Sequence, residues 1–404
     1  MSSKTAGSVT TLLVCGSMIV ALSLGIRHGF GLFMRPMTMD LHWGREAFSI
    51  AIALQNLVWG AAQPFSGWLA DRFGAGRVVL GGGLLYTLGL LLMAHSTVPA
   101  GFSLSAGVLV GLGLSGTTFS VVYGAVGRAV SQGQRAKALA LVGAAGSFGQ
   151  FALVPASQYL MDGVGWFQTL LVLALASAMI APLAAGAAER NRPAAALGPD
   201  QSALEALREA FSQRSFWLLT LGFFVCGFQV VFIGSHLPAY LLDQGLSANV
   251  GMMALALIGL FNIFGSYGFG VAAGYVSNRH LLVGIYFARG TVIWAFLMLP
   301  VTPVSVGVFA ALMGLLWLIT VPLTNGVVAQ VFGVRYLAML SGFVFFSHQV
   351  GSFLGVWLGG LLFDQTGSYR IAWIICIALG VLAALINLPI DERPLHRVSL
   401  EPAR

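Results

Sequence analysis

Two arginines fall inside long apolar stretches of the sequence. Arg27 lies in the stretch 11–36 and Arg289 in the stretch 280–300, and none of the 13 acidic residues is expected inside a helix to pair with them. An uncompensated arginine costs about 2.5 to 3.5 kcal/mol at the centre of a membrane helix, but it can give a carboxylate two parallel hydrogen bonds. We therefore expect a small organic anion as partner. The alternative is a structural role for either arginine, with hydrogen bonds to helix carbonyls.

The positions of Arg27 and Arg289 in the chain predict different roles for the two arginines. Arg27 precedes Pro36 by nine residues, which is about 13 Å at 1.5 Å per residue and near the bilayer midplane, so we expect it to contact the substrate. The helix of Arg289 is expected in the outer scaffold, where a supporting role competes with direct contact. Both remain candidate substrate-binding residues.

Two histidines, His28 and His348, also lie well within apolar stretches. An imidazole titrates near pH 6.5, so either side chain could bind substrate and carry a proton with it. The alternative for each is that of a hydrogen-bonded packing residue.

Neutral polar residues suggest the remaining wall of a binding cavity. We expect contributions from Gln55, Tyr123, Gln229, Asn262 and Asn325. Polar side chains in membrane helices can instead form hydrogen bonds between helices, and this alternative stays open for each of them.

The composition of the chain predicts the transmembrane helices that must position these residues. Of 404 residues 58% are hydrophobic and 8% are charged, so the chain requires a bilayer as its solvent. We predict an all-α membrane protein of twelve transmembrane helices in two pseudo-symmetric six-helix bundles. The predicted spans are 11–36, 46–70, 76–95, 99–127, 137–161, 166–188, 214–241, 248–275, 280–300, 303–332, 338–363 and 369–390.

A polar segment divides the chain into a bundle over 1–188, a cytoplasmic linker over 189–213 and a bundle over 214–404. The second part of the linker could form an amphipathic surface helix or stay solvated. A shift of 202 residues relates the bundles, placing Gly149 on Gly351 and Thr118 on Thr320.

The formal charge of +7 is explained by topology. Fifteen of the twenty Lys and Arg residues fall on the face that carries both termini, three on the other face and two inside helices. This distribution predicts cytoplasmic termini in a cell inner membrane, and it removes any need for a nucleic-acid partner. The three cysteines form no metal-binding or disulfide pattern.

The sequence GWLADRFGAGR at 67–77 follows the second span. It resembles the signature loop of the major facilitator superfamily, and the resemblance extends over nearly the whole chain. It implies a gating loop in which an acid and neighbouring arginines form a charge latch, and alternating access as the mechanism. The residues that match are Gly67, Asp71, Arg72, Gly74 and Arg77.

Within that superfamily, the segments 29–37 and 351–370 resemble the monocarboxylate and oxalate/formate transporter group. An arginine in the eighth helix is expected in that group, but the stretch 262–274 contains none. The sequence thus predicts a monomeric secondary transporter of a small organic anion, a monocarboxylate by resemblance, with proton symport as a hypothesis. It predicts no enzymatic activity, cofactor or metal. Export of an amphiphilic or neutral compound and a transporter-like sensor are the alternatives.

Overall fold

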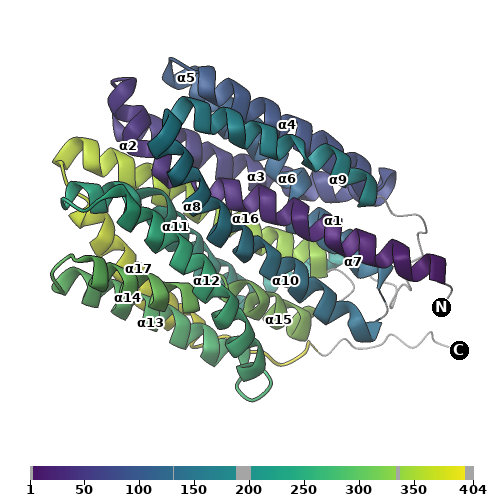
Figure 1. The fold of residues 1–404 in the computed structure, drawn as a ribbon. Coiled ribbons are helices and arrows are strands. Elements are labelled where there is room, and N and C mark those ends of the chain that lie inside the picture. Colours follow the sequence, from purple (N-terminus) through teal and green to yellow (C-terminus); the bar gives the residue numbers. More distant parts are fainter. Residues whose placement is uncertain (1–2, 131, 188–201, 334–336, 396–404) are drawn as a thin grey trace, which may run out of the picture.

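The computed structural model describes residues 3–130, 132–187, 202–333 and 337–395, and every regular element in these ranges is a helix (Figure 1). The N-terminal half contains nine α-helices and one π-helical segment, η1. Their bounds are α1 Ser3–His28, α2 Phe30–Asp40, α3 Arg45–Phe73, α4 Ala75–His95, α5 Pro99–Phe102, η1 Ser103–Leu109, α6 Val110–Thr117, α7 Phe119–Ala129, α8 Gln132–Ala178 and α9 Ile180–Gly186.

The C-terminal half begins with a short helix and continues with longer ones. Their bounds are α10 Ala203–Ser212, α11 Arg214–Asp243, α12 Ala248–Ala272, α13 Asn278–Met298, α14 Pro303–Leu315, α15 Thr320–Phe332, α16 Leu337–Thr366 and α17 Arg370–Asn387. The linker expected over 189–213 is only partly described. Its second part does form a helix, α10. Ser202 precedes this helix and builds a capping box with Glu205. The hydrogen bonds from Ser202 lower the pKa of the Glu205 carboxyl.

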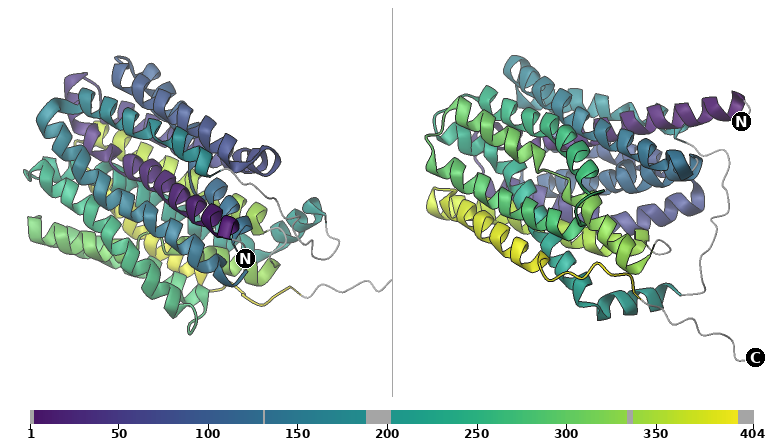
Figure 2. Two further views of the ribbon diagram at one scale, coloured as in Figure 1. Left: turned by 45° about the vertical axis from the view of Figure 1, so that its right-hand side comes forward. Right: turned by 90° about the horizontal axis from the view of Figure 1, so that it is seen from below.

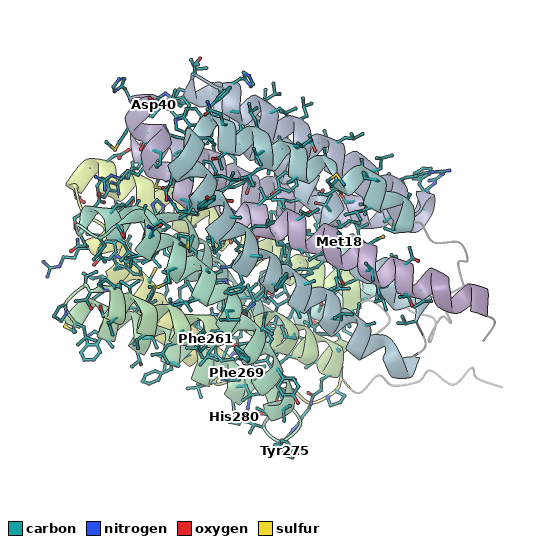
Figure 3. All side chains as sticks on the ribbon, in the orientation of Figure 1. Met18, Asp40, Phe261, Phe269, Tyr275 and His280 are labelled. Carbon is teal, nitrogen blue, oxygen red and sulfur yellow. The ribbon has the colours of Figure 1, made fainter. Side chains whose placement is uncertain are left out.

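Twelve passes through the bundle confirm the predicted all-α fold. Ten stretches in the described chain are long and apolar enough to cross a membrane. One of them, Leu141–Gly186, is divided at Gly165, whose φ of +81° is readily adopted only by glycine. The 29-residue α3 completes the set although its composition is more polar. Large apolar side chains such as Met18 are exposed on the outside, where a bilayer would cover them (Figure 3).

Two close helix crossings repeat between the halves. In the first, α1 and α8 meet so closely that a Cβ on Gly149 would collide with the backbone of Ala21. In the second, α11 and α16 meet so closely that a Cβ on Gly351 would collide with the backbone of Phe224. The two glycines are related by the shift of 202 residues, so the sequence repeat corresponds to a repeated packing arrangement.

Two of the passes are also broken at related positions. The helices α6 and α7 are separated by Thr118, which has an extended backbone, and α14 and α15 are separated by residues 316–319. Thr320, the residue that the repeat places on Thr118, begins α15. Interrupted helices at corresponding positions of two halves are a feature of transporter binding sites.

The halves make a network of polar contacts at one end of the bundle. We call this the α2 end, because α2 finishes there at Asp40, whereas α1 begins at the opposite end (Figures 2 and 3). The guanidinium of Arg45 on α3 donates to both carboxylate oxygens of Asp243 on α11, over 2.6 and 2.7 Å, and to the Tyr369 hydroxyl over 2.9 Å.

A second carboxylate at the α2 end caps a helix of the other half. Asp364, at the end of α16, accepts hydrogen bonds from the backbone N–H groups of Arg45 and Glu46 over 3.0 and 2.8 Å. These N–H groups open α3, whose own preceding residue, Gly44, has no side chain to cap them. Free N–H groups and the helix dipole favour a carboxylate at this position.

We predict that Asp243→Asn weakens the closure of the α2 end. Losing the charge of one partner of the Arg45 pair should cost about 1 kcal/mol, which corresponds to about fivefold faster hydrogen exchange in the first turn of α3. Hydrogen exchange followed by mass spectrometry measures this in a peptide that contains residues 44–49.

Asp40→Asn is the matched control, because Asp40 also lies at the α2 end but accepts its hydrogen bond from Trp166 within the N-terminal half. Equal exchange rates in both variants and the native protein would show that the Arg45–Asp243 contact does not hold the halves together.

Candidate functional site

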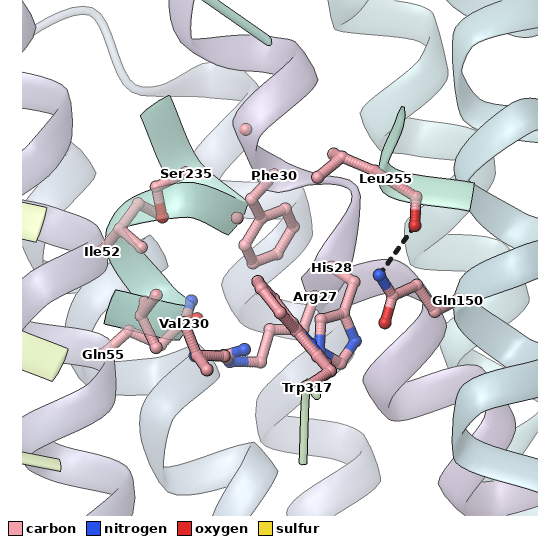
Figure 4. A pocket seen from close by; sticks show the side chains of 13 residues that line it. Arg27, His28, Phe30, Ile52, Gln55, Gln150, Val230, Ser235, Leu255 and Trp317 are labelled. Carbon is pink, nitrogen blue, oxygen red and sulfur yellow. Dashed lines mark hydrogen bonds between the residues drawn. The ribbon is translucent and has the colours of Figure 1, made fainter. Parts of the chain in front are cut away.

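A small cavity lies between the halves, where α1 gives way to α2. Its volume is about 30 Å³, enough for about two water molecules at 10–15 Å³ each. Both halves contribute to its wall (Figure 4). The lining residues are Arg27, His28, Phe30, Gly31, Ile52, Gln55, Gln150, Val230, Val231, Gly234, Ser235, Leu255 and Trp317.

Arg27 projects into this cavity from the last turn of α1. One terminal nitrogen donates to the side-chain oxygen of Asn56, and the guanidinium carbon lies 5.1 Å from the centre of the Trp59 ring. The Nε–H group is buried and has no partner. The positive charge is therefore held by an amide and an aromatic ring, while one donor remains free for a ligand.

His28 lines the cavity beside Arg27. Its Nδ1 lies 2.6 Å from the carbonyl oxygen of Leu24. A carbonyl can only accept, so Nδ1 carries the proton, and in the neutral ring Nε2 is left as an acceptor. The structure thus brings together two of the residues expected at the site, Arg27 and His28, which are adjacent in sequence.

Gln55 is the third expected residue that the cavity wall contains. Its side-chain amide donates to the carbonyl of Ala106 over 2.7 Å, and its Oε1 atom is buried without a partner. Residues not expected at the site accompany it. Gln150 on α8 donates across the halves to the carbonyl of Leu255 over 2.8 Å, and Trp317 lies in the break between α14 and α15.

Three of the expected residues do not line the cavity: two of them bond to neighbouring helices and one bonds within its own helix. Gln229 donates to the carbonyl of Cys376 over 2.8 Å. Asn262 donates to the Ser147 hydroxyl over 2.8 Å and accepts from the backbone N–H of Leu318 over 3.1 Å. His348 pairs through Nδ1 with the Gln349 side chain at 3.0 Å. Roles for these three in binding or proton coupling stay predictions.

Tyr123 on α7 and Asn325 on α15 also lie outside the cavity wall, and both side chains are partly buried. They occupy corresponding positions just after the breaks in the two interrupted passes. Their contact with substrate stays a prediction.

Arg289 has a structural environment that differs from that of Arg27. It is completely buried on α13, and its Nε donates over 2.9 Å to the carbonyl of Leu316. The terminal nitrogens donate to the carbonyls of Leu316 and Trp317 and, over 3.2 Å, to the sulfur of Cys226. Arg289 therefore supplies the donors that the end of α14 lacks, which is the structural role left open by the sequence.

The signature segment 67–77, expected as a loop, is helical except at one residue: it comprises the end of α3, Gly74 and the first turn of α4. Gly74 joins α3 to α4 with a φ of +98°, a conformation that favours glycine, and a Cβ on Gly67 would meet no atom within 4 Å. The guanidinium carbon of Arg72 lies 5.5 Å from the ring centres of Trp68 and Phe73, and Arg77 is exposed. The side chain of Asp71 lies outside the described residues, so the charge latch stays a prediction.

Comparison with known proteins identifies the family. A family model described as the Major Facilitator Superfamily matches residues 13–356. The chain belongs to this superfamily. Superfamily membership agrees with the resemblance of the loop at 67–77, and the family and its relatives are membrane transporters rather than enzymes.

Individual relatives cover most of the chain. It is 28% identical over 385 residues to the uncharacterized MFS-type transporter YcxA of Bacillus subtilis (strain 168), with 90% of each chain covered. It is 27% identical over 364 residues to monocarboxylate transporter 11 of Mus musculus, with 88% of this chain and 81% of the relative covered.

A solved structure supports the fold. The crystal structure of a bacterial homolog of the human lysosomal transporter Spinster, in an inward-facing and unoccupied conformation, matches with a TM-score of 0.71. The match covers 94% of this chain and 96% of that one at 13% identity, and it bears on the architecture alone. The twelve-helix arrangement is therefore that of the major facilitator fold.

We predict that Arg289→Met destabilises this superfamily member. The substitution leaves the carbonyls of Leu316 and Trp317 buried without donors, and each such group costs about 1 to 3 kcal/mol. The measurement is the thermal unfolding temperature of the purified protein, which should fall. Phe287→Ala is the control on the same helix, because Phe287 is 59% exposed. An unfolding temperature in Arg289→Met equal to that of the control would contradict the structural role.

Proposed function

We propose that this protein is a secondary transporter that carries a small organic anion, with the carboxylate bound by Arg27. One observation supports this more than any other: Arg27 faces a cavity between the two halves, and no acidic residue is among those lining it. Arg27 also retains a buried donor without a partner. A carboxylate supplies both the missing charge and the missing acceptor.

A monocarboxylate is the substrate class that the relatives favour. Several of them are named monocarboxylate transporters, among them number 11 of Mus musculus, number 13 of Bos taurus and number 12 of Rattus norvegicus, at 26 to 27% identity. The eighth transmembrane pass, α12, lacks the arginine expected in that group. Arg27, on the first pass, is the cavity residue that can replace it.

Alternating access is the mechanism that we propose for this transport. A cavity of about 30 Å³ is too small for a carboxylate with its carbon chain, so the halves, over 1–188 and 214–404, must separate to admit one. The Arg45, Asp243 and Asp364 contacts close the α2 end and would have to break when that end opens. We place the α1 end, with both termini, on the cytoplasmic side of a cell inner membrane, as the charge distribution favours.

We expect Arg27→Gln to abolish uptake of small carboxylates, lowering the initial rate at least about a hundredfold. The reason is that a charged donor to the carboxylate is lost at a site with no other cation. Proteoliposomes containing the purified protein and a panel of labelled carboxylates provide the measurement. Arg370→Gln is the control, since it removes an equal charge from an exposed position at the α2 end.

Two other outcomes of this experiment would redirect the proposal. Uptake that is equal in Arg27→Gln and Arg370→Gln would show that Arg27 does not bind the anion. Absence of flux for every carboxylate in the native protein would favour export of an amphiphilic or neutral compound, and absence of flux for any compound would favour a sensor.

Proton symport is the energy coupling that we propose, through His28 or His348. In the double variant His28→Gln, His348→Gln, accumulation driven by an inward proton gradient should fall to the level seen without a gradient, because apart from His28 no side chain lining the cavity titrates near neutral pH and His348 is the second proposed carrier. The same vesicles measure it, with His95→Gln as control at an exposed site. Gradient-driven accumulation that persists in the double variant would exclude both histidines as proton carriers.

A further inference from the structure

A buried histidine outside the cavity is connected to the contacts that close the α2 end. His236 lies on α11, seven residues before the helix ends at Asp243, which is about 10 Å at 1.5 Å per residue. Its side chain is fully buried, and it is not among the residues that line the cavity between the halves. It therefore belongs to the closed end and not to the candidate binding site.

Hydrogen bonds fix the tautomer of this histidine. Nε2 lies 2.8 Å from the carbonyl oxygen of Val356, and Nδ1 lies 3.1 Å from the hydroxyl oxygen of Tyr369. A carbonyl can only accept, so Nε2 carries the proton, and Nδ1 of the neutral ring accepts the hydrogen of the Tyr369 hydroxyl. The sulfur of Met34, 3.9 Å from that hydroxyl, is a weaker acceptor for the same hydrogen.

The Tyr369 hydroxyl joins His236 to the N-terminal half. Its oxygen accepts from the guanidinium of Arg45 over 2.9 Å, so a chain of hydrogen bonds runs from Arg45 through Tyr369 to His236. Arg45 is on α3, whereas the other two residues belong to the C-terminal half. The neutral form of His236 is thus part of the contact between the halves.

A second proton on His236 would reverse one of these bonds. Nδ1–H would then donate to the Tyr369 oxygen, to which the Arg45 guanidinium also donates. Two positive charges would meet on one neutral oxygen inside the protein, and the tyrosine hydrogen would turn to the sulfur of Met34. The closed α2 end therefore opposes this proton.

The acidic residues around this contact are bound to other donors. Both oxygens of Asp243 accept from the Arg45 guanidinium, and both oxygens of Asp364 accept from the backbone at the start of α3. Glu46 accepts from an indole N–H of α16 over 3.1 Å. None of these carboxylates forms a hydrogen bond with His236 to offset a charge on its ring.

Three further ionisable groups lie near the same contact, and none supplies a negative charge. Arg35 lies 3.9 Å from Asp243 and adds a positive charge at this end. The ring of Tyr240 lies 6.2 Å from that of Tyr369, and a phenol is neutral below about pH 10. Arg370 is exposed to solvent.

Packing prevents the imidazole from turning away from Tyr369. Gly359 on α16 leaves the space that the ring occupies, because a Cβ there would lie 2.6 Å from Nε2 and 2.7 Å from Cδ2 of His236. On the other side the ring of Phe232 lies 5.4 Å away. A charge on the ring is therefore relieved by removing Arg45 and admitting water, and both follow when the halves separate at the α2 end.

We propose that His236 is a pH sensor that controls the α2 end. A proton on its imidazole favours the state in which Arg45 has left Tyr369 and water reaches the ring, so acid should open this end and neutral pH should close it. This rests on the alternating access of the proposed function. It is separate from proton coupling through His28 or His348, because it changes how often the end opens.

The test measures opening in the full-length protein in liposomes. Spin labels at Val98→Cys and Leu299→Cys, which are exposed positions at the α2 end of the two halves, report their separation by pulsed electron paramagnetic resonance. Cys15 is replaced by alanine, and Cys226 and Cys376 are buried. From pH 8 to pH 5.5, a range above the titration of ordinary carboxylates, we expect the ratio of open to closed protein to rise at least about fivefold.

The variant His236→Gln assigns the response to this residue. A glutamine amide can donate to the Val356 carbonyl and accept from Tyr369 but does not titrate, so the open-to-closed ratio should keep its value at pH 8 throughout the range. His95→Gln is the matched control, since His95 is an exposed histidine at the end of α4 that bonds to its own helix. It should retain the response of the labelled parent protein.

The outcomes distinguish this proposal from the proposed function. An α2 end that opens when butyrate is added, with no dependence on pH, would overturn the sensor and leave alternating access in place. An end that stays closed at every pH, with and without butyrate, would overturn alternating access and the sensor with it. A pH response that persists in His236→Gln would show that His236 is not the sensor.

Discussion

Hydrogen-bonding groups that leave a helix inside a bilayer need partners from the protein, because hydrocarbon supplies none. The break between α14 and α15 frees the carbonyls of Leu316 and Trp317, and the guanidinium of Arg289 satisfies both of them. Asn262 supplies the acceptor for the freed N–H of Leu318. The place of Trp317 in the cavity wall depends on this arrangement, since Trp317 lies in the break.

The N-terminal half supports its own break in a different way. Thr118 separates α6 from α7, and its hydroxyl accepts from the indole of Trp59 over 3.1 Å while it donates to the Leu114 carbonyl. The Trp59 ring in turn lies against the guanidinium of Arg27. Each half thus connects one arginine to one interrupted helix, but only the arginine of the first half keeps a donor for a ligand. In the function that we propose, the repeated fold thus places a structural arginine in one half and a binding arginine in the other.

One helix, α3, connects the closed α2 end with the cavity. At that end, Asp364 of one half caps α3 of the other, and the same helix α3 carries Gln55 to the cavity wall and Asn56 and Trp59 to Arg27. A movement of α3 away from α16 would therefore open the end and change the wall around Arg27 together. In the mechanism that we propose, substrate binding and gating are coupled through this one rigid helix.

The sequence by itself determined the membrane environment, the all-α fold, the sequence repeat and the placement of Arg27, His28 and Gln55 in candidate positions. These follow from composition, from apolar length and from spacing, which are local properties of the chain. The sequence could not distinguish Arg27 from Arg289, because the difference lies in carbonyls that a break in another helix exposes. It also did not identify Gln150 or Trp317 as residues of the cavity wall, and it did not show that Gln229 and Asn262 bond to neighbouring helices. Which face of a helix meets a cavity, and which buried atoms remain without partners, is decided only when helices distant in sequence pack together.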